Sequence, residues 1–281
     1  MEFMKIQGAG NDFIIINNMK LKIPTDIIPK IAQKVCQRKI SLGADGFMAI
    51  DFSDKEADFK MRFYNSDGSI GEMCGNGARC IARYAYENGI AGKSMTFETG
   101  AGIVSAEIVG KRLVKVELNK PEKVELNSDV NIDGKKYECS YIELGNPGLP
   151  HAVVKYEGLA NADENMLREL GRKIRYYDTF PKGANVNFYE ITDDSSAIVK
   201  TYERGVEDFT LACGTGSGST AAVLLLKGSL KGNTVKIMVP GGELFIEADI
   251  RDNSVEKLYL TGDTNIIATG IIKDEDLKRW E

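Results

Sequence analysis

The sequence predicts an α/β (α+β) chain of two similar domains, each with strands packed around a central helix. Two glycine-rich stretches support this prediction, because residues 74–80 and 213–218 both read Cys-Gly-x-Gly. Each stretch runs directly into an apolar helical pattern, over residues 81–86 and 221–226 respectively. A pattern that occurs twice at a helix start indicates that one structural unit was duplicated.

Further pairs of matching features share nearly the same separation along the chain. They are the glycine loops at 43–47 and 183–188, Tyr64 and Tyr202 before the cysteine loops, the strand starts at Gly10 and Gly148, and the glycines at 100–102 and 241–242. Glycine loops recur by chance, whereas one shared separation favours duplication of an α/β unit. We expect one domain over residues 1–120, completed by a C-terminal segment at about 266–281, and a second over residues 121–265.

The elements of the first half can be assigned in order. Residues 5–17 are typical of a short strand, a glycine turn and a buried strand. Apolar residues at spacings of three and four predict a helix over 24–39, with Thr25 or Asp26 as its N-cap. The elements expected after it are strands at 47–50 and 59–64, a turn at 65–68, a helix that ends near Asn88 and Gly89, and strands at 95–98, 103–108 and 113–118.

Composition narrows the class of protein. The 281 residues include 36 Lys and Arg against 41 Asp and Glu, a net charge of −5, which argues against nucleic acid as a partner. The N-terminus carries charges where a signal peptide needs an apolar core, and the longest apolar run, 221–226, is far too short to cross a bilayer. Five cysteines in so long a chain fit a reducing compartment better than a disulfide framework. We expect a cytoplasmic protein with a small-molecule partner and no membrane partner.

A cysteine followed by glycines at a helix start has a chemical meaning. Glycines let the backbone turn tightly and expose several N–H groups, and a helix N-terminus favours an anion. The same field lowers the pKa of a cysteine below its usual value of about 8.5. Two such stretches predict that Cys74 and Cys213 are a pair of acid/base thiols around one bound anion.

Inversion of a tetrahedral Cα–H centre requires removal of a proton from one face and return of a proton to the other. Two thiols that face each other across a cleft would do this directly as acid and base. The α-carboxylate of an amino acid would lie on backbone N–H groups of the two loops, which would also stabilise the charge that develops there. These groups belong to Gly75, Asn76, Gly77, Gly214, Thr215 and Gly216. The chemistry requires no cofactor and no metal.

The other cysteines have a simpler interpretation. A lone cysteine is most often a small buried residue, which we expect for Cys36, Cys80 and Cys139. A metal site at Cys74 and Cys80 is disfavoured by the spacing and by the lack of a second cysteine pair. The glycine-rich stretch at 214–219 lacks the lysine of a phosphate-binding loop.

Three further residues are candidates for the site. His151 is the only histidine of the chain. A lone histidine is usually structural, yet a thiol base needs a polar neighbour that controls its protonation state. Glu203 and Arg204 precede the second cysteine loop, and this place favours a role in the site over a plain surface pair.

Five stretches resemble the diaminopimelate epimerase family, namely residues 8–13, 64–68, 74–80, 202–206 and 212–216. The resemblance covers nearly the whole chain in the same order. It implies a cofactor-independent isomerase, usually a homodimer, that interconverts LL- and meso-diaminopimelate on the route to lysine and peptidoglycan. It also implies two pseudo-symmetric domains, each a mostly antiparallel sheet wrapped around a central helix.

The resemblance also implies roles for individual residues. Cys74 and Cys213 would be the two acid/base thiols, and His151 and Glu203 would assist them. Arg204 would hold the distal carboxylate of the substrate. The residues that would bind the substrate are Asn11, Asn65, Gly75, Asn76, Asn185, Glu203, Arg204, Gly214 and Thr215.

Some positions depart from the pattern of the family. Gly46 stands where some members have glutamine, Phe209 where glutamate is usual, and Gly218 and Ser219 where a small residue and a cysteine are usual. The separation of the repeats also places Leu149 at the position of a polar substrate-binding residue. A related racemase of another amino acid, independent of pyridoxal phosphate, is therefore an alternative. A binding protein on the same scaffold, and a redox or metal role for the cysteines, are two others.

Overall fold

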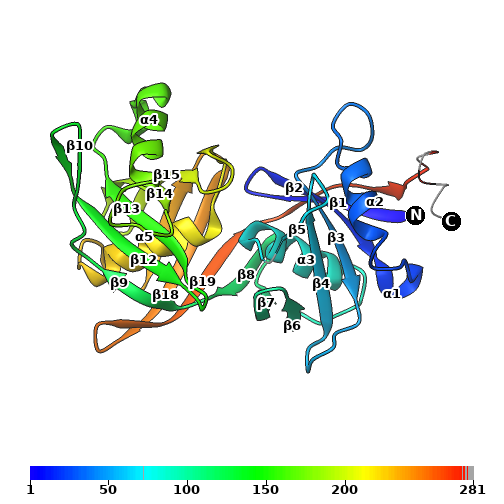
Figure 1. The fold of residues 1–281 in the computed structure, drawn as a ribbon. Coiled ribbons are helices and arrows are strands. Elements are labelled where there is room, and N and C mark those ends of the chain that lie inside the picture. Colours follow the sequence, from blue (N-terminus) through cyan, green and yellow to red (C-terminus); the bar gives the residue numbers. More distant parts are fainter. Residues whose placement is uncertain (72, 274, 276, 278–281) are drawn as a thin grey trace. The chain divides into compact units, whose positions relative to one another are not determined.

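The computed structural model describes residues 1–71, 73–273, 275 and 277. The chain forms two compact units, of which unit 1 comprises Met1–Val116 with Gly262–Glu281, and unit 2 comprises Glu117–Thr261. In Figure 1 the labels of β1–β8 gather around α3, and those of β12–β15 and β18 gather around α5. Each unit is therefore a sheet with one central helix.

Unit 1 draws its elements from both ends of the chain. They are β1 (Glu2–Gly8), β2 (Asn11–Asn17), α1 (Asn18–Leu21), α2 (Ile28–Val35), β3 (Gly46–Asp51), β4 (Phe59–Asn65), β5 (Ile70–Gly71), α3 (Gly75–Glu87), β6 (Ser94–Thr99), β7 (Gly102–Ile108), β8 (Leu113–Leu118) and β20 (Asn265–Ile271). The sheet runs β20–β1–β2–β3–β4–β6–β7–β8, and β5 extends one end of β4. Only the β2–β3 and β4–β6 pairs among these are parallel.

Unit 2 is built from one continuous segment. Its elements are β9 (Pro121–Glu125), β10 (Val130–Ile132), β11 (Lys135–Tyr137), β12 (Cys139–Leu144), β13 (Leu149–Lys155), η1 (Leu159–Asn161), α4 (Glu164–Arg175), β14 (Asn185–Asp193), β15 (Ser196–Glu203), β16 (Asp208–Phe209), α5 (Gly214–Leu226), β17 (Thr234–Val239), β18 (Gly242–Arg251) and β19 (Ser254–Asp263). Its sheet contains the run β9–β12–β13–β14–β15–β17–β18, and β16 extends β15. The β13–β14 and β15–β17 pairs are parallel.

The two units repeat one another strand by strand. The series β1–β2–α2–β3–β4–β5–α3–β6–β7 has the same order, and the same parallel and antiparallel pairs, as β12–β13–α4–β14–β15–β16–α5–β17–β18. The register matches too, because the parallel ladder begins at Phe13 and Gly46 in unit 1 and at His151 and Asn185 in unit 2. The predicted fold class, two duplicated domains of mostly antiparallel sheet around a helix, is confirmed.

The central helices α3 and α5 are buried on nearly all sides. Each is packed against strands from both ends of its own sheet. In α5 the run Ala221–Leu224 is fully buried, and in α3 burial extends from Gly75 to Ala85. A helix with no charged side chain, such as α5, belongs inside a core, and α3 takes the same central place in its own sheet.

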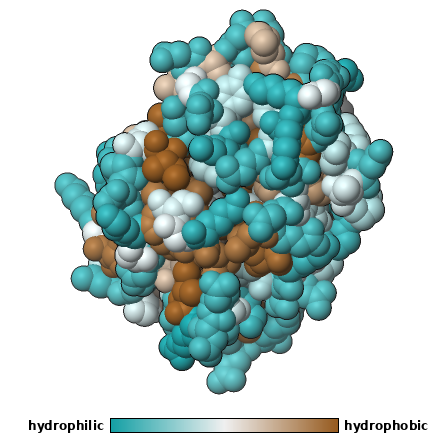
Figure 2. All heavy atoms as spheres, turned by 90° about the vertical axis from the view of Figure 1, so that its left-hand side faces the viewer, coloured by the Kyte–Doolittle hydropathy of each residue, from teal (hydrophilic) through white to brown (hydrophobic). Residues whose placement is uncertain are grey.

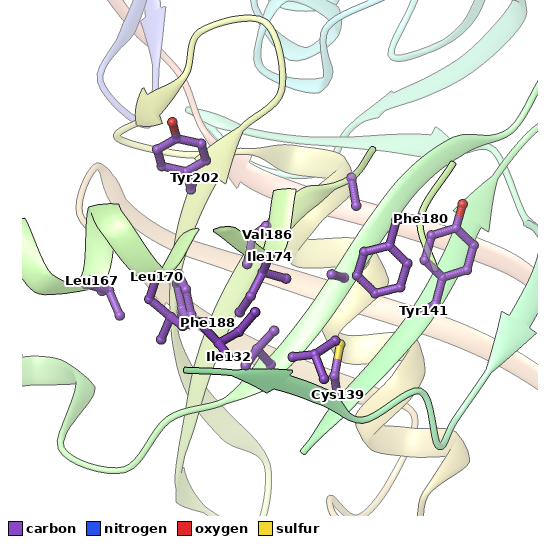
Figure 3. Packing of buried hydrophobic residues seen from close by; sticks show 14 of the residues in the cluster. Ile132, Cys139, Tyr141, Leu167, Leu170, Ile174, Phe180, Val186, Phe188 and Tyr202 are labelled. Carbon is purple, nitrogen blue, oxygen red and sulfur yellow. The ribbon is translucent and has the colours of Figure 1, made fainter. Parts of the chain in front are cut away.

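The outer helices α2 and α4 are amphipathic and cover the other face of each sheet. In α2 the residues Ile28, Ile31, Ala32 and Val35 are buried, at the spacing of one helix face. In unit 2, Leu167, Leu170 and Ile174 of α4 join a core cluster with strand residues such as Phe188 (Figure 3). Within the same cluster, the rings of Tyr141 and Phe180 stack with centroids 5.0 Å apart.

The helix predicted over 24–39 is shorter than expected. It spans Ile28–Val35, and its N-cap is Ile27, whose side chain makes no capping hydrogen bond. Thr25 and Asp26 lie in the turn before it, so the predicted N-cap was wrong. Pro29 in the first turn accounts for the start, because proline lacks the N–H that this turn leaves unpaired and its fixed φ suits a helix. The strands predicted in the first half, and the end of α3 near Asn88, are confirmed.

Hydrophilic side chains cover most of the face in Figure 2, and hydrophobic ones gather in a band across its middle. No helix in the described ranges is both long and apolar enough to cross a membrane.

Candidate active-site residues

Cys74 and Cys213 occupy the same place in the two units. Each is the N-cap of its central helix and has an extended backbone, and the following glycine is the first helical residue. The N–H groups of a first helical turn have no partner within the helix, and they favour negative charge nearby. Both cysteines therefore lie where a thiolate would be stabilised, as the sequence predicts.

In unit 1 the Cys74 thiol contacts the start of β2. Its Sγ lies 3.6 Å from Oδ1 of Asn11, and Nδ2 of Asn11 donates to a carboxylate oxygen of Asp45 at 2.7 Å. The side chain of Asn11 is thereby oriented, with its carbonyl oxygen toward the thiol. Asn65 lies at the exposed end of β4, where its amide donates to the Ser69 hydroxyl at 2.9 Å.

An ion-pair network fixes the loop that carries Asp45. Arg38 contacts Asp12 at 2.6 Å and Asp45 at 2.9 Å, and Lys5 contacts Asp12 at 2.9 Å. Burial alone would raise the pKa of Asp12, but the hydrogen bonds from Lys5 and Arg38 hold that pKa below its usual value. Because this carboxylate stays charged, the network ties the Asn11 segment to the loop before β3.

The strands beneath α3 are apolar. Phe13 and Phe63 meet edge to face with centroids 6.0 Å apart. A Cβ on Gly77, in the first turn of α3, would lie 3.3 Å from the methyl carbon of Met48. These side chains come from β2, β3 and β4, so the Cys74 helix begins above a hydrophobic part of its sheet.

A fully buried charged residue lies in α3 beside this apolar surface. Arg79 of α3 is 0% exposed, and its guanidinium donates to the carbonyl of Gly75 at 3.3 Å and to Oδ1 of Asn76 at 3.1 Å. Asn76, which the sequence assigns to substrate binding, is 2% exposed, and its side chain is held by this arginine.

In unit 2 the Cys213 thiol faces its own helix. Its Sγ accepts from the N–H of Gly216 at 3.4 Å and lies 3.5 Å from the Thr215 hydroxyl. Thr215 and Gly214, two of the predicted substrate-binding residues, form the first turn of α5.

The strands beneath α5 carry a buried polar chain. The Thr201 hydroxyl donates to Oδ1 of Asn187 at 2.9 Å, and Nδ2 of Asn187 lies 3.2 Å from Nδ1 of His151. The amide nitrogen of Asn187 also reaches the carbonyls of Ala152 at 3.1 Å and Asn185 at 3.4 Å. Those carbonyls fix which end of the amide is the donor.

These hydrogen-bonded side chains determine the tautomer of His151. Because Nδ1 accepts from Asn187, the proton of the neutral ring lies on Nε2, and Nε2 has no hydrogen-bond partner among the described residues. Burial lowers the pKa of His151 to about 3, and the positive charge of Arg204 acts in the same direction. His151 is therefore a neutral imidazole that can donate a hydrogen bond through Nε2.

Three predicted residues lie together at the end of β14 and β15. The Asn185 side chain is 4% exposed, accepts from the backbone N–H of Arg204 at 2.8 Å and donates to the carbonyl of Pro150 at 3.2 Å. The Arg204 guanidinium donates to the Lys182 carbonyl at 3.2 Å. Burial raises the pKa of the Glu203 carboxyl. The structure thus brings Glu203, Arg204 and Asn185 together in unit 2.

Sequence reasoning missed Asn187, Thr201 and Arg79. Asn187 lies two residues after Asn185, on the same face of β14, and it is a polar residue in the buried first half of the strand. That parity, read with the repeat, is the signal that could have found it. Arg79 stood inside the quoted cysteine motif as the one charged residue of an apolar helix start.

The three remaining cysteines are packing residues, as predicted. Cys36, Cys80 and Cys139 are 3%, 0% and 1% exposed. Burial raises the pKa of the Cys36 and Cys139 thiols to about 12 and raises that of Cys80 as well. In the described part of the chain, no three His, Cys, Asp or Glu side chains come together as metal ligands.

Two of the departures from the family pattern have packing reasons. A Cβ at Gly46 would lie 2.8 Å from the Phe63 ring and 3.1 Å from the Tyr64 carbonyl, so Phe63 occupies the space of a longer side chain. Phe209 packs against Phe188 and Tyr202 at centroid distances of 6.3 and 6.0 Å. Both positions serve the local core.

Known proteins resemble this chain along its whole length. A family model described as diaminopimelate epimerase matches residues 3–124 and 144–267. A diaminopimelate epimerase of Aquifex aeolicus (strain VF5) is 40% identical, over 99% of this chain and 100% of the relative, and one of Archaeoglobus fulgidus is 38% identical over 98% of each.

Solved structures share the fold at low sequence identity. A probable proline racemase from Agrobacterium radiobacter K84 has a TM-score of 0.69 at 17% identity, over 97% of this chain and 93% of that one. A PhzF-family phenazine biosynthesis protein of Bacillus anthracis has a TM-score of 0.72 at 14% identity, over 97% and 99%. The sequence matches are decisive for the family, and the chain belongs to the diaminopimelate epimerase family.

Proposed function

We propose that the protein is an isomerase that interconverts LL- and meso-diaminopimelate, for lysine and peptidoglycan precursor synthesis, by proton transfer between Cα and two thiols. The observation that carries this proposal is the pair of cysteines, each the N-cap of a buried central helix in one of two duplicated units. The family to which the chain belongs, and the names of its relatives, support the substrate.

The reaction needs one thiolate and one thiol. The thiolate takes the Cα proton from one face, and the thiol on the other face gives its proton to the carbanion. The substrate leaves with inverted configuration, and the two sulfurs have exchanged protonation states. Backbone N–H groups of Gly75, Asn76, Gly214 and Thr215 would hold the α-carboxylate and stabilise the charge that spreads onto it.

His151 and Glu203 suit the role of assisting the thiols. A neutral imidazole with its proton on Nε2 can donate a hydrogen bond without adding a positive charge. A carboxyl group whose pKa is raised by burial is more easily protonated, so Glu203 can also exchange a proton. Both groups would modulate the thiols without competing as strong bases.

The remaining predicted residues would orient the two ends of the substrate. We assign Asn11, Asn65 and Asn185 to its amino and carboxylate groups, and Arg204 to its distal carboxylate. A guanidinium suits a carboxylate because its N–H groups form a planar fork. No cofactor is part of this mechanism.

Proton exchange in D2O tests the proposal directly. LL-diaminopimelate incubated with the protein should acquire deuterium at Cα and become a mixture with the meso isomer. Cys74→Ser and Cys213→Ser should each lower turnover by at least about 100-fold. Cys139→Ala is the matched control, because that thiol is buried in the core of unit 2 and should be dispensable for turnover.

The same assay separates the alternatives. A panel of other L-amino acids would show deuterium in one of them, and none in diaminopimelate, if the chain were a racemase of another amino acid. Tight binding of diaminopimelate without any exchange would identify a binding protein. Activity that a chelator abolishes would favour a metal role for the cysteines.

A mild oxidant tests whether both thiols approach one carbon. Hydrogen peroxide should join Cys74 to Cys213, because it accepts two electrons and two protons from the thiols and becomes two waters. The product should be inactive and should recover with a thiol reductant. A peptide map in which each cysteine is oxidised separately, with no disulfide between them, would contradict the shared position.

We also propose that the protein works in the cytoplasm as a homodimer. None of the five cysteines is joined to another by a disulfide, which suits a reducing compartment, and the family resemblance supports the dimer. Light scattering after gel filtration measures the oligomeric state, and a mass equal to one chain would contradict the dimer.

A further inference from the structure

Arg79 is a charged side chain at a place where a charge is costly. It heads the largest fully buried side chains of the described residues, and it lies in the helix that begins at Cys74. Removing a guanidinium from water costs several kcal/mol unless an anion compensates it. The positive end of the α3 dipole adds to that cost.

Its hydrogen bonds do not neutralise it. The two that it makes go to uncharged oxygens, of Gly75 and Asn76, and its Nε has no partner among the described residues. A Cβ on Gly8 would lie 3.2 Å from Nη2 of Arg79, so the glycine of β1 leaves room for the guanidinium. Among the residues that the structure describes, no carboxylate is hydrogen-bonded to this buried cation.

Among the described residues, three groups could supply a negative charge to Arg79, and two can be set aside. The three are Cys80, Cys74 and Asp263. Cys80 is fully buried, and burial raises its pKa, so it stays a thiol. The Asp263 side chain is 46% exposed and is paired with Arg112. Cys74, partly exposed at the N-cap, remains.

We propose that Arg79 is the buried countercharge of Cys74, a positioning residue that favours the thiolate of Cys74 and holds the Asn76 side chain beside it. The inference rests on the proposed function only where that function makes Cys74 a base. Unit 2 provides the contrast, because the matching position in α5 is Gly218, where a Cβ would lie 2.8 Å from Leu118 and 3.0 Å from Leu258. The helix position that holds the cation in unit 1 therefore holds a glycine in unit 2.

The pH dependence of alkylation tests this assignment. Each thiol of the full-length protein is labelled with iodoacetamide between pH 5 and pH 10. The labelling rate of each thiol is measured by mass spectrometry of the peptide that contains it, and the pH at which this rate is half-maximal is its midpoint. In Arg79→Met the midpoint for Cys74 should rise by about one pH unit or more, which means about tenfold slower labelling at pH 6. Arg79→Lys should retain most of the wild-type midpoint.

Cys213 in the same samples is the internal control. The pH midpoint of its labelling should stay unchanged in both variants, because Arg79 lies in the central helix of the other unit. A Cys74 midpoint that does not move in folded Arg79→Met, or that moves together with Cys213, overturns the proposal. Labelling requires no turnover, so this result stands whether or not the proposed reaction is correct.

A second measurement does not depend on the folding of an Arg79 variant. Cys74→Asp places a permanent anion above Arg79, and Cys74→Asn is its neutral match, since both side chains serve equally as N-caps. Cys74→Asp should have the higher Tm at pH 7. The Tm difference between Cys213→Asp and Cys213→Asn measures the effect of the helix N-terminus alone. If the Tm difference between Cys74→Asp and Cys74→Asn is no larger, Arg79 is not a countercharge of residue 74.

Discussion

Asn187 and Thr201 lie below the first turn of α5, whereas the matching strand positions below α3 carry Met48 and Phe63. The ladders align these pairs, because Met48 faces Phe63 in the β3–β4 register as Asn187 faces Thr201 in β14–β15. His151 likewise takes the position of Phe13. One backbone plan therefore supports a hydrophobic surface in one unit and a hydrogen-bonded chain in the other.

The two units therefore share the position of the thiol at the start of the central helix, but the residues around that thiol differ. Cys74 begins a helix that contains a buried guanidinium, and Cys213 begins one whose supporting strands carry neutral polar groups. In the proposed mechanism, which needs one thiolate and one thiol, such unequal surroundings would favour the proton on one of the two sulfurs.

The largest expected loss of stability and activity comes from a substitution that gives unit 2 the residue of unit 1. Asn187→Met should cost roughly 4 kcal/mol of folding free energy, because it leaves Thr201 and Nδ1 of His151 buried without partners. Epimerase activity should fall by about 100-fold in the protein that still folds, since His151 loses its fixed tautomer. Urea unfolding and the deuterium assay measure the two effects.

Met48→Asn is the reciprocal control. It buries an amide where the neighbours are apolar, so it should destabilise by about 1–3 kcal/mol and should change kcat much less. Equal losses of kcat in the two variants would mean that the polar chain is only a packing device.

The next effect is a dependence of stability on pH. The folded pKa of His151, about 3, lies below its unfolded value of about 6.5, so the unfolded chain binds a proton first as the pH falls. This group contributes stability that is fully present above pH 6.5 and is lost progressively toward pH 3. The loss should be about 1.4 kcal/mol per pH unit, or roughly 2–3 kcal/mol between pH 6.5 and pH 4.5.

His151→Phe, which copies Phe13 of unit 1, should flatten that slope. Urea unfolding at several pH values measures the slope. The depressed pKa of Asp12 keeps its carboxylate ionised between pH 6.5 and pH 4.5, so Asp12 contributes little to the slope there. An unchanged slope in His151→Phe would show that other groups cause the acid sensitivity.

The smallest effect compares two matched glycines. In Gly216→Ala the new Cβ would overlap Oδ1 of Asn187 and lie 3.0 Å from the Thr201 hydroxyl, both held by hydrogen bonds. In Gly77→Ala it would lie 3.3 Å from the flexible end of Met48. Thermal unfolding should show Gly216→Ala destabilised by about 2 kcal/mol and Gly77→Ala nearly unchanged, because alanine also improves helix propensity. Similar Tm values for the two variants would show that the strand residues below α5 are no more rigid than those below α3.

Much of this arrangement could be read from the sequence. Glycine loops and apolar periodicity identified α3, α5 and the duplicated strands, because these depend on local backbone requirements. The start of α2 was missed, since Pro29 moved it past two good N-cap residues. His151 and Glu203 were candidates by their place beside loops and strands, yet their protonation states could not be predicted, because these depend on burial and on partners distant in sequence.

Arg79 and Asn187 show why the rest was hidden. A charged residue in a helix is normally a surface residue, and nothing local indicates that this one is buried. Asn187 is polar in a strand that could have had one face in water. The packing of α5 onto β14, a contact between distant segments, is what buries its amide below the first turn of α5.

The pairing of β20 with β1 affects how the protein can be made. Strand β20 follows all of unit 2 along the chain, yet it lies at the edge of unit 1, where Ile272 and Met1 also exchange backbone hydrogen bonds. During translation, unit 2 can be completed while β1 still lacks its neighbour. Unit 1, whose synthesis begins first, therefore completes its sheet only after unit 2 has been made, and until then β1 has an open strand edge.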